Sequence, residues 1–201
     1  MSTILYIKAN AKSEGESRTF KVSDSFIESY RKFHPEDEII TLDLSKEDIR
    51  LLSAEDINTI FGPKTDESRN HPILRYAYQF VEAAKYVIAE PLWNLSIPAV
   101  LKAYIDYICV TGITFKYTEE GSMGLCQGKK AINISTRGGT YSAEPFSAFE
   151  MGDRYLRVLF VFLGITDFTT ISADGLDVIG NDVEAIVGEA IKEAQEKAKD
   201  F

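Results

Sequence analysis

The chain has 201 residues, 45% of them hydrophobic and 26% charged, with a formal net charge of −9. These values predict one soluble globular domain over residues 1–201 with a large apolar core, and the acidic balance argues against a nucleic-acid partner. No apolar run reaches the roughly 18 residues that a membrane-spanning helix needs. Because no signal peptide precedes the first predicted strand, we expect a cytoplasmic protein without a membrane partner.

The first half of the chain alternates strand patterns with helix patterns. The predicted elements are a strand at Thr3–Lys8, a polar loop over residues 9–19, a helix from Phe20 to Phe33, a strand at Glu38–Leu44, a short helix from Ser53 to Phe61, a longer helix at His71–Ala84 and a buried strand at Tyr86–Ala89. Pro35 and Gly62-Pro63 stop the first two helices.

The second half continues the alternation with one insertion. We expect a helix from Ala99 to Cys109, a small hairpin or flap within residues 111–128, a strand at Lys129–Thr136, a segment Pro145–Phe149 that leads into a helix ending before Gly164, a strand at Phe168–Ala173 and an amphipathic helix at Asn181–Lys199. Gly164 suits the position that follows a helix end.

Strand and helix alternate five times, which predicts an α/β fold with a parallel sheet between two helical layers. A conspicuous loop after the third strand, Pro91–Ser96, favours the strand order 2-1-3-4-5. Neither a GxGxxG loop nor a P-loop motif is present in the sequence.

Cys109 and Cys126 are the only cysteines, and their spacing matches no zinc motif. His34 and His71 are too few for a histidine metal cluster. We therefore expect reduced thiols and no metal site.

Three loops follow strands one, three and four and must meet at one edge of a parallel sheet. In the first loop, Ser17, Arg18 and Thr19 at a helix start suit a phosphate, although Ser17 also suits a plain helix cap. In the second, Trp93 and Asn94 offer an aromatic face and mixed polar groups to a flat heterocycle, although a Trp is also commonly packed inside.

The third loop, Thr136–Thr140, holds two adjacent glycines after Arg137. Gly138 and Gly139 let the backbone approach a ligand and donate N–H groups to it, although glycine pairs also form simple turns.

Several blocks of the sequence together resemble one family. They are Pro-Leu-Trp-Asn-Leu-Ser-Ile-Pro-Ala from residue 91, Leu-Lys-Ala-Tyr-Ile-Asp from residue 101, Gly-Ile-Thr-Phe-Lys-Tyr-Thr-Glu from residue 112, Gly-Lys-Lys-Ala from residue 128 and Ser-Thr-Arg-Gly-Gly from residue 135. They resemble the FMN-dependent NADH:azoreductase and quinone reductase family of flavodoxin-like proteins, from Thr3 to Asp167.

The resemblance implies a flavodoxin-like three-layer sandwich, non-covalent FMN, a homodimer and a ping-pong reaction in which NADH or NADPH donates a hydride and a quinone or azo compound is reduced. It places Asn10, Ser17, Arg18 and Thr19 at the phosphate, Leu92, Trp93, Asn94 and Leu95 along the isoalloxazine, and Thr136, Arg137, Gly138 and Gly139 at its pyrimidine side. The family often has Ser at Asn10, Tyr at Trp93 and Phe at Leu95.

Hydride transfer by a flavin requires no acid or base from the protein, so we expect no catalytic side chain. Phe115, Tyr117 and Phe162 are candidate walls of a substrate pocket, with core packing the alternative for Phe115 and Phe162. Two other functions stay open: an FMN-binding electron carrier that does not oxidise NADH, and a metal-dependent nucleotide hydrolase.

Overall fold

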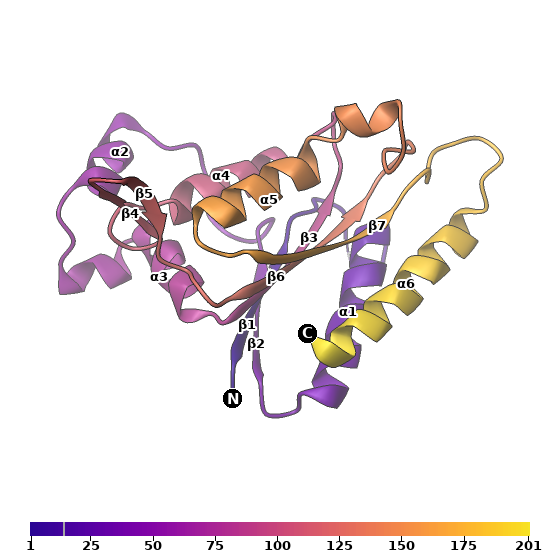
Figure 1. Ribbon diagram of the computed structural model, residues 1–201, viewed down its shortest axis with the longest axis horizontal. Coiled ribbons are helices and arrows are strands. Elements are labelled where there is room, and N and C mark those ends of the chain that lie inside the picture. Colours follow the sequence, from indigo (N-terminus) through magenta and orange to yellow (C-terminus); the bar gives the residue numbers. More distant parts are fainter. Residues whose placement is uncertain (14) are drawn as a thin grey trace.

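The computed structural model describes residues 1–13 and 15–201; Glu14, in the predicted first loop, lies outside the described residues. Five parallel strands form one sheet in the order β2-β1-β3-β6-β7 (Figure 1). The strands are β1 (Thr3–Lys8), β2 (Glu38–Asp43), β3 (Lys85–Pro91), β6 (Lys130–Thr136) and β7 (Asp167–Ala173). This topology confirms the predicted order 2-1-3-4-5.

Helices cover both faces of the sheet. They are α1 (Arg18–Phe33), α2 (Ala54–Phe61), α3 (Leu74–Glu82), α4 (Ala99–Ile108), α5 (Gly152–Phe162) and α6 (Val183–Asp200). Figure 1 shows α1 and α6 side by side on one face, whereas α4 and α5 lie across the other. The three predicted layers are therefore present.

The alternation of side chains along β1 explains why two cores form. Leu5 and Ile7 pack with residues of α3, α4 and α5, whereas Ile4 and Tyr6 pack with residues of α1 and α6. Successive strand side chains point to opposite faces of a sheet, so a strand covered on both sides is apolar along most of its length. The central strand β3 is accordingly buried from Tyr86 to Pro91.

Some predicted helix boundaries differ from the structure. The first helix begins at Arg18 because the Ser17 side chain caps it, and the helix expected at His71–Ala84 runs only from Leu74 to Glu82 after a separate 3₁₀ turn, η1 (Asp66–Asn70). The segment Pro145–Phe149, which was expected to lead into a helix, contains a 3₁₀ turn, η2 (Phe146–Phe149), ahead of α5. Gly164 has φ +95°, which confirms its predicted place after the helix end.

The predicted insertion is an antiparallel hairpin of β4 (Phe115–Thr118) and β5 (Gly121–Gly124). It packs against the end of α5, where Cys126 N donates to Leu163 O at 2.9 Å. Because α5 runs back toward the start of β7, the hairpin lies beside the amino ends of the strands. Within the described residues, no helix is both long and apolar enough to cross a membrane.

Candidate functional site

A cavity of about 250 Å³, the first cavity, lies at the carboxyl edge of the sheet. Its lining consists of Asn10, Lys12, Glu16, Arg18, Thr19, Pro91, Leu92, Trp93, Thr136, Arg137, Gly138, Leu176 and Asp177. All three predicted loops contribute, because the strands that they follow end at this edge. Ser17, Asn94, Leu95 and Gly139 were also predicted to bind the cofactor, and they lie outside this lining.

The first loop is organised by the buried side chain of Asn10. Its Nδ2 donates to Ser17 Oγ at 2.9 Å, and its Oδ1 accepts from Lys12 N at 3.0 Å. Ser17 Oγ in turn accepts from Phe20 N at 3.1 Å and caps α1. Ser17 therefore performs the capping role that was its alternative interpretation, and Asn10 holds that cap against the loop.

Beyond the cap, the start of α1 supplies donors and positive charge. The first N–H groups of a helix have no intrahelical acceptor, and those of α1 belong to Arg18 and Thr19. Arg18 Nη1 reaches Leu176 O at 3.2 Å and Asp177 Oδ1 at 3.0 Å, and Lys12 adds a second cation to the lining. This end of the cavity has the donor set of an anion site.

The second loop is a tight turn. Trp93 and Ser96 exchange backbone hydrogen bonds at 2.9 Å and 3.1 Å, while Asn94 and Leu95 between them have φ values of +50° and +70°. Two consecutive left-handed residues define a type I′ turn, which normally contains glycine. No glycine stands at either position, so the turn type was not predicted.

Trp93 lies between two cavities. Its side chain is 41% exposed and borders both the first cavity and a second, more apolar cavity of about 520 Å³. Asn94 borders only the second cavity, beside Ala11 and Val100. The turn thus presents Trp93 at the surface instead of packing it into either core, which was the alternative interpretation.

The third loop is fastened to a fourth loop, residues 174–181, which follows β7. The carbonyl groups of Arg137, Gly138 and Gly139 accept from the N–H groups of Leu176, Asp177 and Gly175 at 3.1, 2.9 and 2.9 Å. A Cβ atom at Gly138 would lie 2.5 Å from Oδ2 of the exposed Asp177 side chain, which would have to move aside. The fourth loop was missed, although a fifth parallel strand must also end at this edge.

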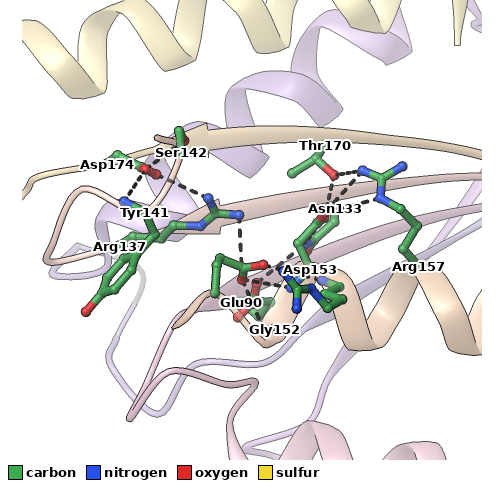
Figure 2. A network of polar contacts seen from close by, with 12 residues as sticks. Glu90, Asn133, Arg137, Tyr141, Ser142, Gly152, Asp153, Arg157, Thr170 and Asp174 are labelled. Atoms are coloured by element: carbon green, nitrogen blue, oxygen red, sulfur yellow. Dashed lines mark hydrogen bonds and ion pairs between the residues drawn. The ribbon is translucent and has the colours of Figure 1, made fainter. Parts of the chain in front are cut away.

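A buried polar network that the sequence did not predict lies under the loops (Figure 2). Glu90 of β3 is fully buried, and its Oε1 accepts a long hydrogen bond of 3.4 Å from Asn133 Nδ2. Asn133 Nδ2 also donates to Asp153 Oδ1 at 3.2 Å, and Asp153 pairs with Arg157. Burial raises the pKa of Glu90 to about 7, although Ser135 and Asn133 act in the opposite direction.

The three predicted substrate-pocket aromatics lie together at the hairpin. The ring of Phe115 is 4.8 Å from that of Phe162 and 5.5 Å from that of Tyr117. Phe115 is buried in the core, Phe162 is partly exposed and Tyr117 is 69% exposed. The cluster borders the amino ends of the strands, so none of the three lines the first cavity of its own chain.

Comparison with known proteins agrees with this geometry. Residues 2–198 match a family model described as having the flavodoxin-like fold. The chain belongs to this flavodoxin-like family. Within it, the chain is 67% identical to "FMN-dependent NADH:quinone oxidoreductase 2" of Clostridium acetobutylicum and 61% identical to "FMN-dependent NADH:quinone oxidoreductase" of Caldicellulosiruptor saccharolyticus, with 100% of each chain covered in both comparisons.

Solved structures of azoreductases superpose on this chain over nearly their whole length. An azoreductase from Bacillus anthracis superposes with a TM-score of 0.90 at 36% identity over 100% of both chains. An FMN-dependent NADH-azoreductase of the same species, solved in complex with FMN, superposes with a TM-score of 0.88 at 31% identity over 100% of this chain and 99% of the other.

Proposed function

We propose that this protein is an FMN-dependent NADH:quinone oxidoreductase that also reduces azo compounds. One observation carries the proposal: the first cavity joins an anion site at the start of α1 to an exposed aromatic turn and a glycine loop. Relatives of the same length carry the quinone oxidoreductase name, and the superposed structures are azoreductases.

The residues present fit FMN, and the anion site fits its phosphate. The N–H groups of Arg18 and Thr19 and the cations of Arg18 and Lys12 are suited to bind it. Thr19 Oγ1 and Thr136 Oγ1 lie 2.6 Å apart and join the first loop to the third. Asn10 and Ser17 act on this site by holding the start of α1 in place.

The other end of the cavity fits a flat ring. Leu92 and Trp93 provide apolar and aromatic surface to this end of the cavity. We assign Asn94 and Leu95 a supporting role, because they form the turn that positions Trp93. Gly138 and Gly139 have no side chain, so the third loop can approach the ring and direct backbone N–H groups toward it.

Bound FMN would accept a hydride from NADH and then reduce the quinone or azo compound. The chain's own part is to bind and orient. Trp93 offers its exposed aromatic side chain to the flavin ring, so that the opposite face of the ring stays open and either substrate can stack on it in turn. No side-chain nucleophile or general base is assigned, because the chemistry belongs to the cofactor.

We also propose that the protein is a cytoplasmic homodimer. Exposed apolar side chains follow one another along η2 and α5: Phe146, Phe149, Met151, Val158, Val161 and Phe162. Val158 alone is 66% exposed, and apolar surface of this kind marks an interface. If a second subunit packs on this face, Phe115, Tyr117 and Phe162 of one subunit would line the substrate pocket of the other.

Steady-state kinetics tests the enzyme function. Protein loaded with FMN is expected to oxidise NADH with menadione present, and to give parallel lines in double-reciprocal plots because the two substrates bind in turn. Protein that binds FMN yet consumes no NADH would instead be the electron carrier. Protein that binds no FMN would contradict both.

A further inference from the structure

Arg137 is an unusual residue for the wall of a ligand cavity, because its charged side chain is buried. It is 5% exposed and lines the first cavity together with Leu92 and Trp93. Its Nε is buried with no hydrogen-bond partner among the described residues. A buried guanidinium keeps its charge, so this cation acts over a short distance with little screening from water.

Two carboxylates, those of Glu150 and Asp174, form ion pairs with the guanidinium, and Figure 2 shows Asp174 beside Arg137. Asp174 Oδ1 lies 3.5 Å from Nη1, and Glu150 Oε1 lies 3.7 Å from Nη2. Asp174 is itself fixed, because its Oδ2 accepts from Tyr141 N at 2.9 Å and Ser142 Oγ at 2.7 Å. The positive charge of Arg137 is therefore partly compensated by neighbours whose positions are set.

Glu150 connects this cation to the second loop. Its Oε1 accepts from Gly152 N at 3.0 Å and Asp153 N at 2.9 Å, which anchors it at the start of α5. The next residue, Met151, donates its N–H to Leu95 O at 2.9 Å. A Cβ atom at Gly152 would lie 2.9 Å from Leu92 Cδ1. Glu150 thus lies beside Arg137, while the two residues that follow it contact the second loop, which carries Trp93.

We propose that Glu150 is a positioning residue that acts through Arg137: together they set the charge at the ring end of the cavity and so the balance between oxidised and reduced FMN. The proposal rests on the proposed function. A reduced flavin carries more negative charge than an oxidised one, so the Arg137 cation favours the reduced form. Glu150 and Asp174 oppose that preference by partly cancelling the cation.

The test measures the dissociation constants of oxidised and reduced FMN for purified protein under anaerobic conditions. Arg137→Gln removes the cation and is expected to weaken binding of reduced relative to oxidised FMN about tenfold, a fall in midpoint potential of about 30 mV for two electrons. Glu150→Gln can still accept the N–H groups at the start of α5 while it removes the opposing charge, so the ratio is expected to move about tenfold the other way.

Opposite shifts separate the proposal from a structural role, because a loosened site would move both variants in the same direction. Asp174→Asn is expected to shift the ratio of the two dissociation constants in the same direction as Glu150→Gln. If Arg137→Gln does not fold, the two carboxylate variants still test the proposal. Glu144→Gln makes the same chemical change on an exposed side chain of the same connection and is expected to leave the ratio unchanged.

The outcomes distinguish this inference from the function on which it rests. Wild-type protein that binds no FMN overturns the proposed function and the inference with it. The inference alone is overturned if wild-type protein binds FMN but the carboxylate variants leave the ratio of dissociation constants unchanged. It is also overturned if they shift that ratio toward weaker binding of reduced FMN, which is the direction expected for Arg137→Gln.

Discussion

Glu90 is a carboxyl group whose chemistry is altered by its burial in the sheet. It stands on the central strand β3 beside Asn133 and Ser135 of β6, and its Oε2 has no hydrogen-bond partner in the described part of the chain. Burial disfavours the charged carboxylate and raises its pKa from 4.5 to about 7. The carboxyl group therefore carries a proton below neutral pH and costs stability when it loses that proton.

This cost predicts a pH dependence with a definite sign. The folded state binds the Glu90 proton more tightly than the unfolded state, so the free energy of unfolding falls as the pH rises from 4.5 toward 7. Replacing Glu90 by Gln removes that loss, which amounts to roughly 3 kcal/mol for a shift of this size. Urea unfolding of the wild type and of Glu90→Gln at pH 5 and pH 8 measures how much the free energy of unfolding of each protein changes with pH.

The matched control for Glu90 is Glu119→Gln, on the exposed turn of the hairpin. It is expected to leave the pH dependence of unfolding unchanged. Equal pH dependence in wild type and Glu90→Gln would show that this carboxyl group titrates at the same pH in both states.

At the scale of elements, the hairpin is held by a contact that only glycine permits. A Cβ atom at Gly124 of β5 would lie 2.1 Å from the backbone carbon of Leu163, and backbone cannot move aside as a side-chain end can. Together with the hydrogen bond from Cys126 N to Leu163 O, this contact fixes where Phe115 and Tyr117 lie relative to α5.

Gly124→Ala is therefore expected to destabilise the protein by about 2 kcal/mol or more, because the hairpin must separate from the end of α5. Gly188→Ala is the control: a Cβ atom there meets nothing within 4 Å, and alanine is expected to stabilise helix α6 by about 1 kcal/mol. Denaturant midpoints compare the two variants, and similar midpoints would contradict the close contact.

The elements that could be predicted from the sequence are those with a strong hydrophobic period. The burial of β3 and the amphipathic α6 follow from their patterns, and the Ser53 cap with its acidic first turn locates α2. The exact start of α5 does not, because local propensity cannot reveal the contact between Met151 N and Leu95 O that lies at this point.

The candidate site was predictable in outline, because the ends of parallel strands must meet. Its polar interior was not, since no pattern marks Glu90 of β3 as a buried carboxyl group, and the prediction that Arg137 meets the cofactor did not include the burial of its side chain beside Glu150 and Asp174. The type I′ turn at Asn94 and Leu95 was also hidden, because neither residue is a glycine.

At the scale of the whole molecule, the exposed apolar face of η2 and α5 predicts association of two chains. Val158→Asp places a charge at the centre of that face and is expected to shift the protein from dimer to monomer. Ile179→Asp changes an even more exposed apolar residue on the fourth loop and is expected to leave the dimer intact. Sedimentation velocity measures both, and a wild-type monomer would contradict the proposal.

The first cavity is proposed to bind FMN through both the phosphate and the ring of the cofactor. Titration of flavin-free protein with FMN and with riboflavin, followed by flavin fluorescence, tests this assignment. We expect saturable binding of one FMN per chain, with riboflavin at least about tenfold weaker because it has no phosphate for the start of α1. Absence of FMN binding, or equal affinity for the two flavins, would contradict it.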